Sequence, residues 1–437
     1  MSTNEAALTQ DERHDKYREW RDAAKLSVVM IGRDEGFHLA NNLPHILGEV
    51  YELIYMDTGS TDASRDWMAG MGAKVYDTPW RMDFSAARNA ALEKATGRWI
   101  LSLDCDEFIP RQEMRNLNRL LSKADWTCQA FKVEMEMSND NIPIEGELNQ
   151  QLRCFPNHKG LKWQHLVHEQ IAPALMEKGI HPEPAGVRII HKGYNSMRDP
   201  NTGQPDNSRV KAKCQRNREC LGIEIERSEA AVAEGKKPER MLNIPYYHMA
   251  KCAAVVGVFE EAEEYIRKCV ETALPEGHPD YQIIAGYKFW GDIYSIQGKN
   301  DEALVVWETA AKRWPADVTF PTAIGVKLAE MGRLDDAYSA LRGAADMDVI
   351  VGPVASPAAR GRYQVYELLA KICAKKAEVA GGDEALMTEA AEWREKARSM
   401  IGVRSKLTEV PSADAGPASQ EGESDAVSSE QTQVVSQ

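Results

Sequence analysis

Hydrophobic and polar positions divide the first hundred residues into short apolar segments separated by amphipathic ones. The apolar segments are rich in aliphatic and β-branched residues, as expected for strands buried on both faces of a sheet. Their alternation with helical patterns predicts a parallel sheet covered by helices. The predicted strands are Leu26–Ile31, Leu53–Met56, Lys74–Tyr76 and Trp99–Leu103, and the predicted helices are roughly Glu35–Leu47, Ala63–Met71 and Ser85–Ala95.

Beyond about residue 125 the pattern changes to looser strands joined by longer loops. The predicted strands are Thr127–Met135, Gln151–Phe155 and Val187–His191. Apolar and acidic residues alternate in Val133–Met137, which predicts an edge strand with one solvent-exposed face. We expect this half of the domain to form one side of a cleft.

From about Lys211 the sequence is helical almost without interruption, and small residues recur at a spacing of about 34 residues. Small residues where two antiparallel helices touch, with aromatic residues filling the gaps, are typical of tetratricopeptide repeats. A helical bundle without repeats is the alternative, but three matched positions at one period argue against it. The matched pairs are Gly291 and Gly325, Gly298 and Gly332, and Ala303 and Ala337, with an earlier copy at Tyr246, Ala250, Gly257, Ala262 and Ile266.

The chain is therefore predicted to contain an α/β domain followed by an all-α, tetratricopeptide-like solenoid. The C-terminal segment has no aromatic residues and is rich in Ser, Gln and acidic residues, so it cannot bury enough apolar surface to fold. The predicted divisions are a polar N-terminal extension (1–24), the α/β domain (25–210), a helical connector (211–243), the repeats (244–350), a closing helical pair (351–403) and a disordered tail (404–437).

The composition of the chain limits which partners the protein can bind and where in the cell we expect it. The net charge of −14 argues against nucleic acid as a partner, because phosphate contacts require clustered Lys and Arg. No segment is apolar enough over the roughly 18–20 residues that span a bilayer, and the N-terminal region lacks the apolar core of a signal peptide. The eight cysteines include no CxxC pair and are expected to be reduced thiols. We expect a cytoplasmic protein.

Acidic residues follow the fourth predicted strand directly. Asp104 and Asp106 would lie at the carboxyl edge of the sheet, where open α/β sheets bind ligands. Two carboxylates at positions i and i+2 can hold a hard divalent cation, which can neutralise a diphosphate. A solvated acidic loop is the alternative for so short a motif.

Two further polar residues lie near the same edge. Asp57 ends the second strand before a turn at Gly59, where its carboxylate could accept hydrogen bonds from a base or a ribose. Arg88 opens the helix before the fourth strand, where the helix dipole and a cationic side chain together suit an anion. Both side chains are expected to lie outside the core.

These motifs together resemble the family 2 glycosyltransferases of the GT-A fold. The resemblance is closest to the branch containing bacterial lipopolysaccharide-core glucosyltransferases and the peptide S-glycosyltransferases of glycosylated bacteriocins, several of which also carry tetratricopeptide-like helices. It implies a Rossmann-like, mostly parallel sheet. It is carried by IGRDE, MDTGSTD and FSAARNAALEKATGRWILSLDCDE within Leu26–Ile109, and more weakly by His168-Glu169, Ile190–Tyr194 and Lys211–Asn217.

The resemblance implies a UDP-sugar donor and a role for each matching residue. Glu35 would line the nucleoside pocket, Asp57 would contact the base, and Arg88 would contact the base or the diphosphate. Asp104 would lie near the ribose and the metal, and Asp106 would bind Mn²⁺ or Mg²⁺. Many relatives have Asn-Glu where this chain has Asp34-Glu35, so we assign Asp34 no role.

An inverting transfer also requires a general base, which in this fold comes from the second half of the domain. Glu169 is the predicted catalytic base, with a structural carboxylate paired to Arg or His as the alternative. His191 is the predicted additional metal ligand, with a hydrogen-bonded strand-end histidine as the alternative. His168 is a rival for the metal.

The sequence thus predicts a metal-dependent, inverting glycosyltransferase that moves a hexose from a UDP-sugar to a peptide, protein or surface-glycan acceptor. The repeats are expected to bind a protein partner or to form a homodimer. The alternative is a tetratricopeptide scaffold with an inactive transferase domain. A nucleotidyltransferase is a third class, but Gly32–Gly36 is not the Gly-rich, Lys-containing loop that it requires.

Overall fold

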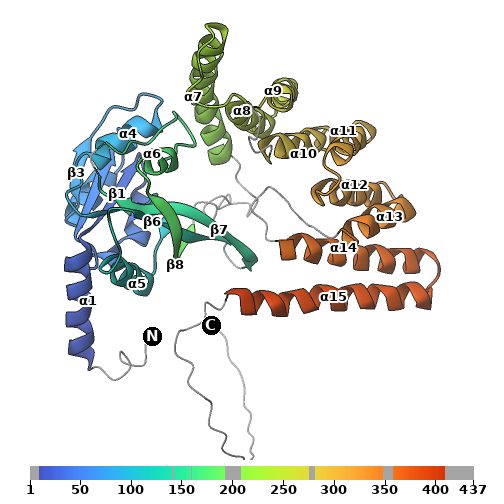
Figure 1. Cartoon of the computed structure of the whole chain (residues 1–437), viewed down its shortest axis with the longest axis horizontal. Helices are drawn as coiled ribbons and strands as arrows, with labels where there is room; N and C mark the ends of the chain where they lie inside the picture. The colour runs from blue at the N-terminus through green and yellow to red at the C-terminus, as the bar shows by residue number, and fades with distance from the viewer. Residues whose placement is uncertain are drawn as a thin grey trace, which may run out of the picture.

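The protein consists of a sheet domain from which a curved array of helices extends (Figure 1). The structure is a computed structural model, and it describes residues 9–139, 142–158, 160–191, 208–274, 281–347 and 358–408. Eight strands of these residues form one sheet in the order β3-β2-β1-β4-β7-β6-β8-β5. The strands are β1 (Leu26–Gly32), β2 (Glu52–Asp57), β3 (Lys74–Asp77), β4 (Trp99–Ser102), β5 (Glu107–Phe108), β6 (Gln129–Asn139), β7 (Ile142–Pro156) and β8 (His181–His191).

The first half of the sheet is parallel, and its four predicted strands are confirmed. The second half is mixed, because β7 runs antiparallel to β4 and to β6, whereas β6 and β8 are parallel. The prediction of an edge strand at Val133–Met137 is wrong, since β6 lies between β7 and β8. The alternation has another cause: Val133 and Met135 are fully buried in the core, while Glu136 on the opposite face pairs with Arg188 at 3.2 Å.

Helices cover both faces of the sheet. The predicted helices are found at their expected places, but the first ends at Asn42 because Pro44 restricts the residue before it and starts a separate 3₁₀ turn. The helices of this domain are α1 (Gln10–Ala24), α2 (Gly36–Asn42), η1 (Pro44–Ile46), α3 (Ser64–Gly70), α4 (Phe84–Leu92), α5 (Arg111–Leu121) and α6 (Ala172–Glu177).

The N-terminal extension contains a helix that the sequence analysis did not assign. Thr9 and Glu12 form a capping box, in which each side chain accepts from the backbone N–H of the other residue. Helix α1 then packs on α5, where the guanidinium of Arg115 lies 4.2 Å from the ring centre of Tyr17. The extension therefore adds to the covering layer of the sheet.

Two apolar clusters lie on opposite faces of the sheet and give the domain three layers. Alternate residues of β1 point to opposite sides, so Val28 joins one cluster and Val29 the other. The first cluster contains the fully buried Trp99 and residues of α2 and α5. The second contains Phe155 and residues of α4 and α6. This packing fixes the strand ends that carry the polar residues described below.

The second half of the chain is all-α, as predicted. Three antiparallel helix pairs, α8/α9, α10/α11 and α12/α13, are followed by the closing pair α14/α15. Helix α15 continues to Thr408, and residues 409–437 of the predicted tail lie outside the described residues. The helices are α7 (Ser208–Ala233), α8 (Asn243–Val256), α9 (Phe259–Glu271), α10 (Tyr281–Ile296), α11 (Asn300–Arg313), α12 (Thr319–Glu330), α13 (Leu334–Ala345), α14 (Ala358–Val379) and α15 (Glu384–Thr408).

The repeated glycines explain the tetratricopeptide-like packing. A Cβ atom on Gly291 would lie 2.1 Å from Trp307 Nε1, and one on Gly325 would lie 2.5 Å from Leu341 Cγ. At the turns within the pairs, Gly298 and Gly332 have φ values of +75° and +76°, which glycine adopts without strain. The same positions therefore have the same structural roles in consecutive repeats.

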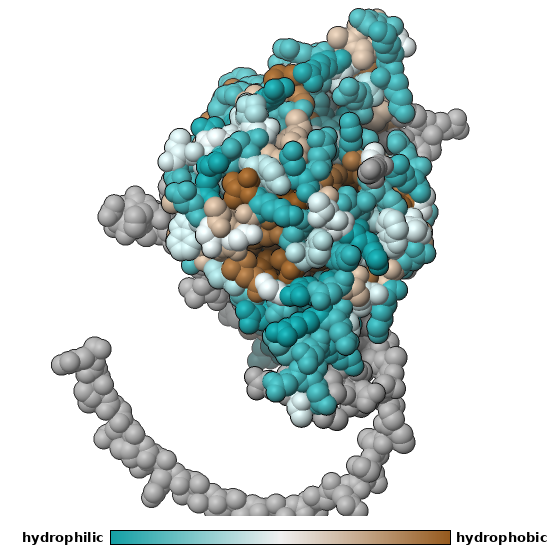
Figure 2. All heavy atoms as spheres, turned by 90° about the vertical axis from the view of Figure 1, so that its left-hand side faces the viewer, coloured by the Kyte–Doolittle hydropathy of each residue, from teal (hydrophilic) through white to brown (hydrophobic). Residues whose placement is uncertain are grey.

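The first helices of the array pack directly on the sheet domain. An apolar cluster joins Phe84 and Val167 to Leu221 of α7, Tyr246 of α8 and Ile293 of α10. The opposite face of the sheet domain is mostly hydrophilic, with a few small apolar patches (Figure 2). Among the described residues, no helix combines the length and the apolar character needed to cross a membrane.

Candidate active site

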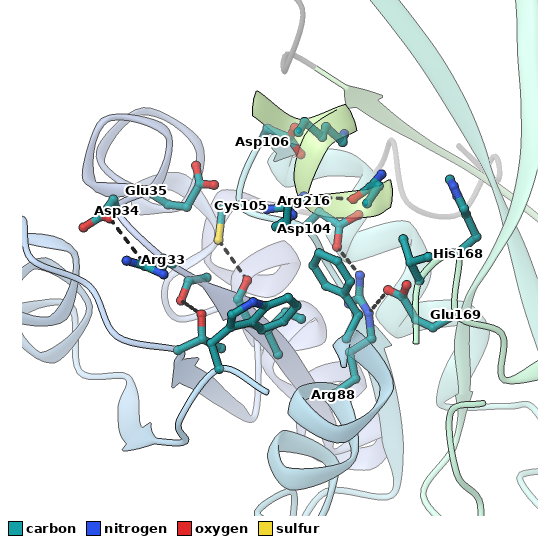
Figure 3. Close-up of a pocket in the computed structure, with 18 of the residues that line it drawn as sticks. Arg33, Asp34, Glu35, Arg88, Asp104, Cys105, Asp106, His168, Glu169 and Arg216 are labelled. Atoms are coloured by element: carbon teal, nitrogen blue, oxygen red, sulfur yellow. Dashed lines mark hydrogen bonds and ion pairs between the residues drawn. The ribbon is translucent and has the colours of Figure 1, made fainter. Parts of the chain in front are cut away.

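A cavity of about 460 Å³ lies at the carboxyl ends of β1 and β4, between the sheet domain and α7 (Figure 3). Its wall is rich in charged groups of both signs. The acidic residues that line it are Asp34, Glu35, Asp104, Asp106 and Glu169, and the basic residues and histidines are Arg33, Arg88, His168, His191, Lys213 and Arg216.

The paired carboxylates lie in the turn between β4 and β5. The residues of β4 are buried, and the chain leaves the sheet after Ser102. The fully buried carboxylate of Glu107 accepts from the backbone N–H of Asp104 at 2.9 Å and so fixes the turn. Asp104 and Asp106 are consequently directed into the cavity, whereas Glu107 is directed into the protein.

Arg88 joins two carboxylates that are far apart in the sequence. Its Nε donates to Glu169 Oε1 at 2.5 Å, and its Nη2 donates to Asp104 Oδ1 at 2.6 Å. Its Nη1 donates to Ser102 Oγ at 3.0 Å. Burial alone would lower the pKa of Arg88, but Asp104 and Glu169 raise it above its ordinary value. The expectation that Arg88 lies outside the core is therefore wrong: it is a buried cation held by two anions.

A second arginine, which the sequence analysis missed, completes this network. Arg153 of β7 donates to Asp104 Oδ2 at 2.8 Å and to the carboxylate of Glu107. Burial would raise the pKa of Asp104, but Arg153 and Arg88 hold it well below its ordinary range. Each oxygen of Asp104 thus accepts from one arginine. A basic residue between the apolar residues Leu152 and Cys154 of a predicted strand was the signal available in the sequence.

Asp106 and His191 come together on the other side of the turn. Strands β5 and β8 pair so that Glu107 lies opposite His191, and this brings His191 Nε2 to 3.4 Å from Asp106 Oδ2. Across the described ranges, no group of three or more His, Cys, Asp or Glu side chains is arranged to hold a metal. The protein thus supplies one carboxylate and one imidazole at this point.

His168 has a different environment, although it also lines the cavity. Its ring stacks on that of His248 in α8, with 3.9 Å between the ring centres. Burial, together with the charge of Arg240, lowers the pKa of His168 to about 4. This histidine therefore connects the loop that carries Glu169 to the helical array.

Asp57 does not line the cavity, and the expectation that it lies outside the core is wrong. It is 2% exposed, and its Oδ2 accepts from the backbone N–H groups of Gly59 and Ser60 at 3.0 and 2.9 Å. Its carboxylate closes the turn after β2, as the short polar side chain of a turn residue commonly does. The sequence analysis did not predict this structural role of Asp57, because the sequence does not show whether the side chain points towards the ligand or towards the backbone of the turn.

The loop after β1 carries Asp34 and Glu35 into the cavity. Asp34 Oδ1 accepts from the backbone N–H of Thr61 at 2.7 Å, which ties this loop to the one after β2. The backbone N–H of Glu35 donates to Ser64 Oγ at 2.8 Å, which leaves the Glu35 side chain at the cavity wall. Asp34, to which the sequence analysis gave no role, thus positions its neighbour.

Three residues of α7 also line the cavity and were not assigned from the sequence. They are Lys213, Arg216 and Asn217, and Arg216 projects from α7 into the same space as Arg88 and Glu169 (Figure 3). Trp80 and Phe84 form the apolar part of the wall, with their rings 4.7 Å apart in an edge-to-face arrangement. The weaker part of the family resemblance, Lys211–Asn217, was the available signal.

An open α/β sheet with paired carboxylates at the carboxyl edge of its parallel half is typical of enzymes that bind diphosphate-containing ligands. Residues 28–194 match the family model described as glycosyl transferase family 2. The sheet domain is therefore similar to members of that family over nearly its whole length, and the tetratricopeptide-like array follows it.

Individual relatives match parts of the chain. A TPR repeat-containing protein of Synechococcus elongatus is 36% identical over 153 residues, which are 35% of this chain and 37% of that protein. The SPbeta prophage-derived glycosyltransferase SunS of Bacillus subtilis is 24% identical over 203 residues, 45% of this chain and 44% of that protein. The chain thus spans less than half the length of these curated relatives. The crystal structure of MamA aligns over 46% of this chain and 96% of its own, with a TM-score of 0.31 and 14% identity.

Proposed function

We propose that the protein is a metal-dependent, inverting glycosyltransferase that transfers a hexose from a UDP-sugar to a peptide, protein or surface-glycan acceptor. The observation that carries this proposal is the convergence of Asp104, Asp106, His191 and Glu169 on one cavity of a family 2 domain. Arg88 connects two of these carboxylates, so the geometry of the acidic turn and of Glu169 is fixed together.

Asp106 and His191 are the residues that would hold the Mn²⁺ or Mg²⁺ ion. Both oxygens of Asp104 already accept from arginines, which favours Asp106 as the main carboxylate ligand and a positioning role for Asp104. Such ions are commonly held by one or two protein groups, with substrate phosphates and water in the other positions. When bound, the ion would neutralise the charge that develops on the leaving diphosphate.

Glu169 would act as the general base. Arg88 holds its Oε1, which leaves Oε2 to take the proton from the acceptor nucleophile. As the nucleophile forms its bond to the anomeric carbon, the bond from that carbon to the diphosphate oxygen breaks, and UDP leaves with the electron pair. The alternative of a purely structural carboxylate also accounts for the Arg88 contact, so a functional test must separate the two.

The donor nucleoside would lie against the loop that carries Glu35, beside Thr58 and Trp80. Asp57 would not touch the donor, but it would hold the backbone of the turn after β2 in place beside the nucleoside. Arg88 would orient Glu169 and Asp104, because its Nε and both terminal nitrogens are already committed to protein oxygens.

The acceptor would be recognised through the helical array. Stacked helix pairs offer an extended concave surface, which suits a polypeptide or a second copy of the chain. The eight cysteines are free thiols, in keeping with the cytoplasmic location that we propose.

Incubation with a panel of nucleotide sugars tests the proposal against a scaffold with an inactive domain. We expect metal-dependent release of UDP from a UDP-hexose, and intact-mass spectrometry of candidate acceptors should show the addition of one or more hexoses. The absence of nucleotide release from every donor, with metal present, would favour the scaffold.

A further inference from the structure

The cations of the cavity differ in whether a carboxylate neutralises them. Arg88 pairs with Asp104 and Glu169, and Arg33 lies 3.6 Å from Asp34. Arg216 of α7 has no carboxylate within ion-pairing distance among the described residues. Its Nη2 donates to Asn217 Oδ1, at the long distance of 3.5 Å. A cation of this kind inside a cavity is suited to an anionic ligand.

The surroundings of Arg216 hold the guanidinium in place without neutralising it. The guanidinium lies 4.8 Å from the ring centre of Phe84, the first residue of α4. Partial burial lowers the pKa of Arg216 below its ordinary value, and the more distant carboxylates of Glu35 and Glu169 oppose this shift. Arg216 is an exposed residue of α7, so its guanidinium is accessible from the cavity.

Lys213 lies three positions before Arg216 on the same helix, so both side chains are on one helix face. Both line the cavity, and Lys213 likewise has no carboxylate within ion-pairing distance in the described part of the chain. Two neighbouring cations that pair with no carboxylate of the described residues match the two phosphates of a nucleoside diphosphate better than Arg88 does.

We propose that Arg216 and Lys213 bind the diphosphate of the donor, so that α7 completes the donor site. The inference rests on the proposed function for the identity of the donor. A planar guanidinium can donate two parallel hydrogen bonds to phosphate oxygens, while the lysine adds a compact positive charge.

The position of α7 is fixed relative to the loop that carries the predicted base. Glu224 of α7 accepts from the backbone N–H of Leu166 at 3.3 Å. It also pairs with Arg240, which donates to the carbonyl oxygen of Val167 at 3.2 Å. The diphosphate cations and Glu169 are therefore parts of one rigid arrangement. The helical region contributes to donor binding as well as to recognition of partners.

Calorimetric titration of the whole protein with Mn²⁺ present tests the proposal, using inorganic pyrophosphate, UDP and uridine as separate probes. We expect Arg216→Ala to weaken pyrophosphate and UDP binding by about 10–100-fold, the usual range for a hydrogen bond to a charged group. Lys213→Ala should weaken both by a smaller factor, and Arg216→Lys should restore part of the loss. Uridine binding should not change.

Arg227→Ala is the matched control, since Arg227 is an exposed arginine of α7 that does not line the cavity. Unchanged pyrophosphate affinity in Arg216→Ala, or no pyrophosphate binding by the wild type, would overturn the assignment. An equal loss of uridine affinity would also overturn it, because it would indicate a distorted cavity. If Arg216→Ala loses pyrophosphate binding but the wild type transfers no sugar from any donor, this diphosphate site would be upheld and the proposed function rejected.

Discussion

The Nε of Arg88 donates to Oε1 of Glu169 at 2.5 Å, which joins α4 to a loop 81 positions further along the chain. The same guanidinium contacts Asp104, so one buried cation sets the distance between the acidic turn and the predicted base. We therefore expect both stability and activity to depend on Arg88.

Arg88→Ala should destabilise the protein as well as inactivate it. Removing one member of a buried ion pair leaves the other charge uncompensated, at a cost of about 3–5 kcal/mol. Arg88→Lys should recover part of the stability. A lysine ammonium cannot, however, reproduce the simultaneous contacts of the planar guanidinium with Glu169 and Asp104. Chemical denaturation measures the effect, with Arg98→Ala at an exposed arginine as the control. Equal stability of Arg88→Ala and the wild type would contradict the network.

Glu169→Gln separates a catalytic carboxylate from a structural one. The amide is nearly isosteric but cannot take a proton, so transfer should fall by about 10²–10⁴-fold, the usual contribution of a general base. Binding of UDP, measured by calorimetry, should stay within a few-fold of the wild type. If Glu169→Gln transfers sugar at the wild-type rate, the carboxylate is structural and the base lies elsewhere.

Two glycine substitutions test the packing of the repeats. Gly291→Ala would place a Cβ atom 2.1 Å from Trp307 Nε1, and overpacking of this kind typically costs about 1–3 kcal/mol. Gly343→Ala, in the helix α13, meets nothing within 4 Å and should raise stability by up to about 1 kcal/mol. Thermal unfolding of both variants measures the contrast. A stable Gly291→Ala variant would argue against the described contact of α10 with α11.

The stacked histidines predict a loss of stability in mild acid. Burial and nearby positive groups lower the pKa of His168 to about 4 and that of His248 to about 2. In the unfolded chain both histidines have a pKa of about 6.5. The unfolded state therefore binds more protons than the folded state at pH values between the folded pKa of each histidine and about 6.5. The free energy of unfolding should therefore decrease as the pH falls from about 6.5 towards 4.

His248→Phe keeps an aromatic ring against His168 but removes one titrating group. Denaturation curves recorded between about pH 5 and 7 should show a shallower pH dependence for this variant than for the wild type. Arg240 and Lys251, which lie near His248, are unchanged in this variant. An unchanged slope would mean that His248 is not a buried, neutral group.

Local sequence pattern was enough to predict the elements but not their long-range partners. One continuous apolar run that ends in carboxylates predicts the strand β4 and the acidic turn after it. Glycines that recur where two helices touch predict the repeats. The contact of Arg153 with Asp104 spans 49 positions and depends on the antiparallel pairing of β7 with β4. The burial of Asp57 and the approach of Arg216 to the cavity likewise depend on tertiary packing, which residue spacing does not encode.

Metal dependence of donor turnover tests the central claim most directly. UDP release from a UDP-hexose would be measured with Mn²⁺ or Mg²⁺ and again in excess chelator, for the wild type and for Asp106→Ala. Asp66→Ala, at an exposed carboxylate of α3, is the control. We predict turnover by the wild type and the control only when metal is present, and almost none by Asp106→Ala. Full turnover in excess chelator, or undiminished turnover by Asp106→Ala, would contradict the account.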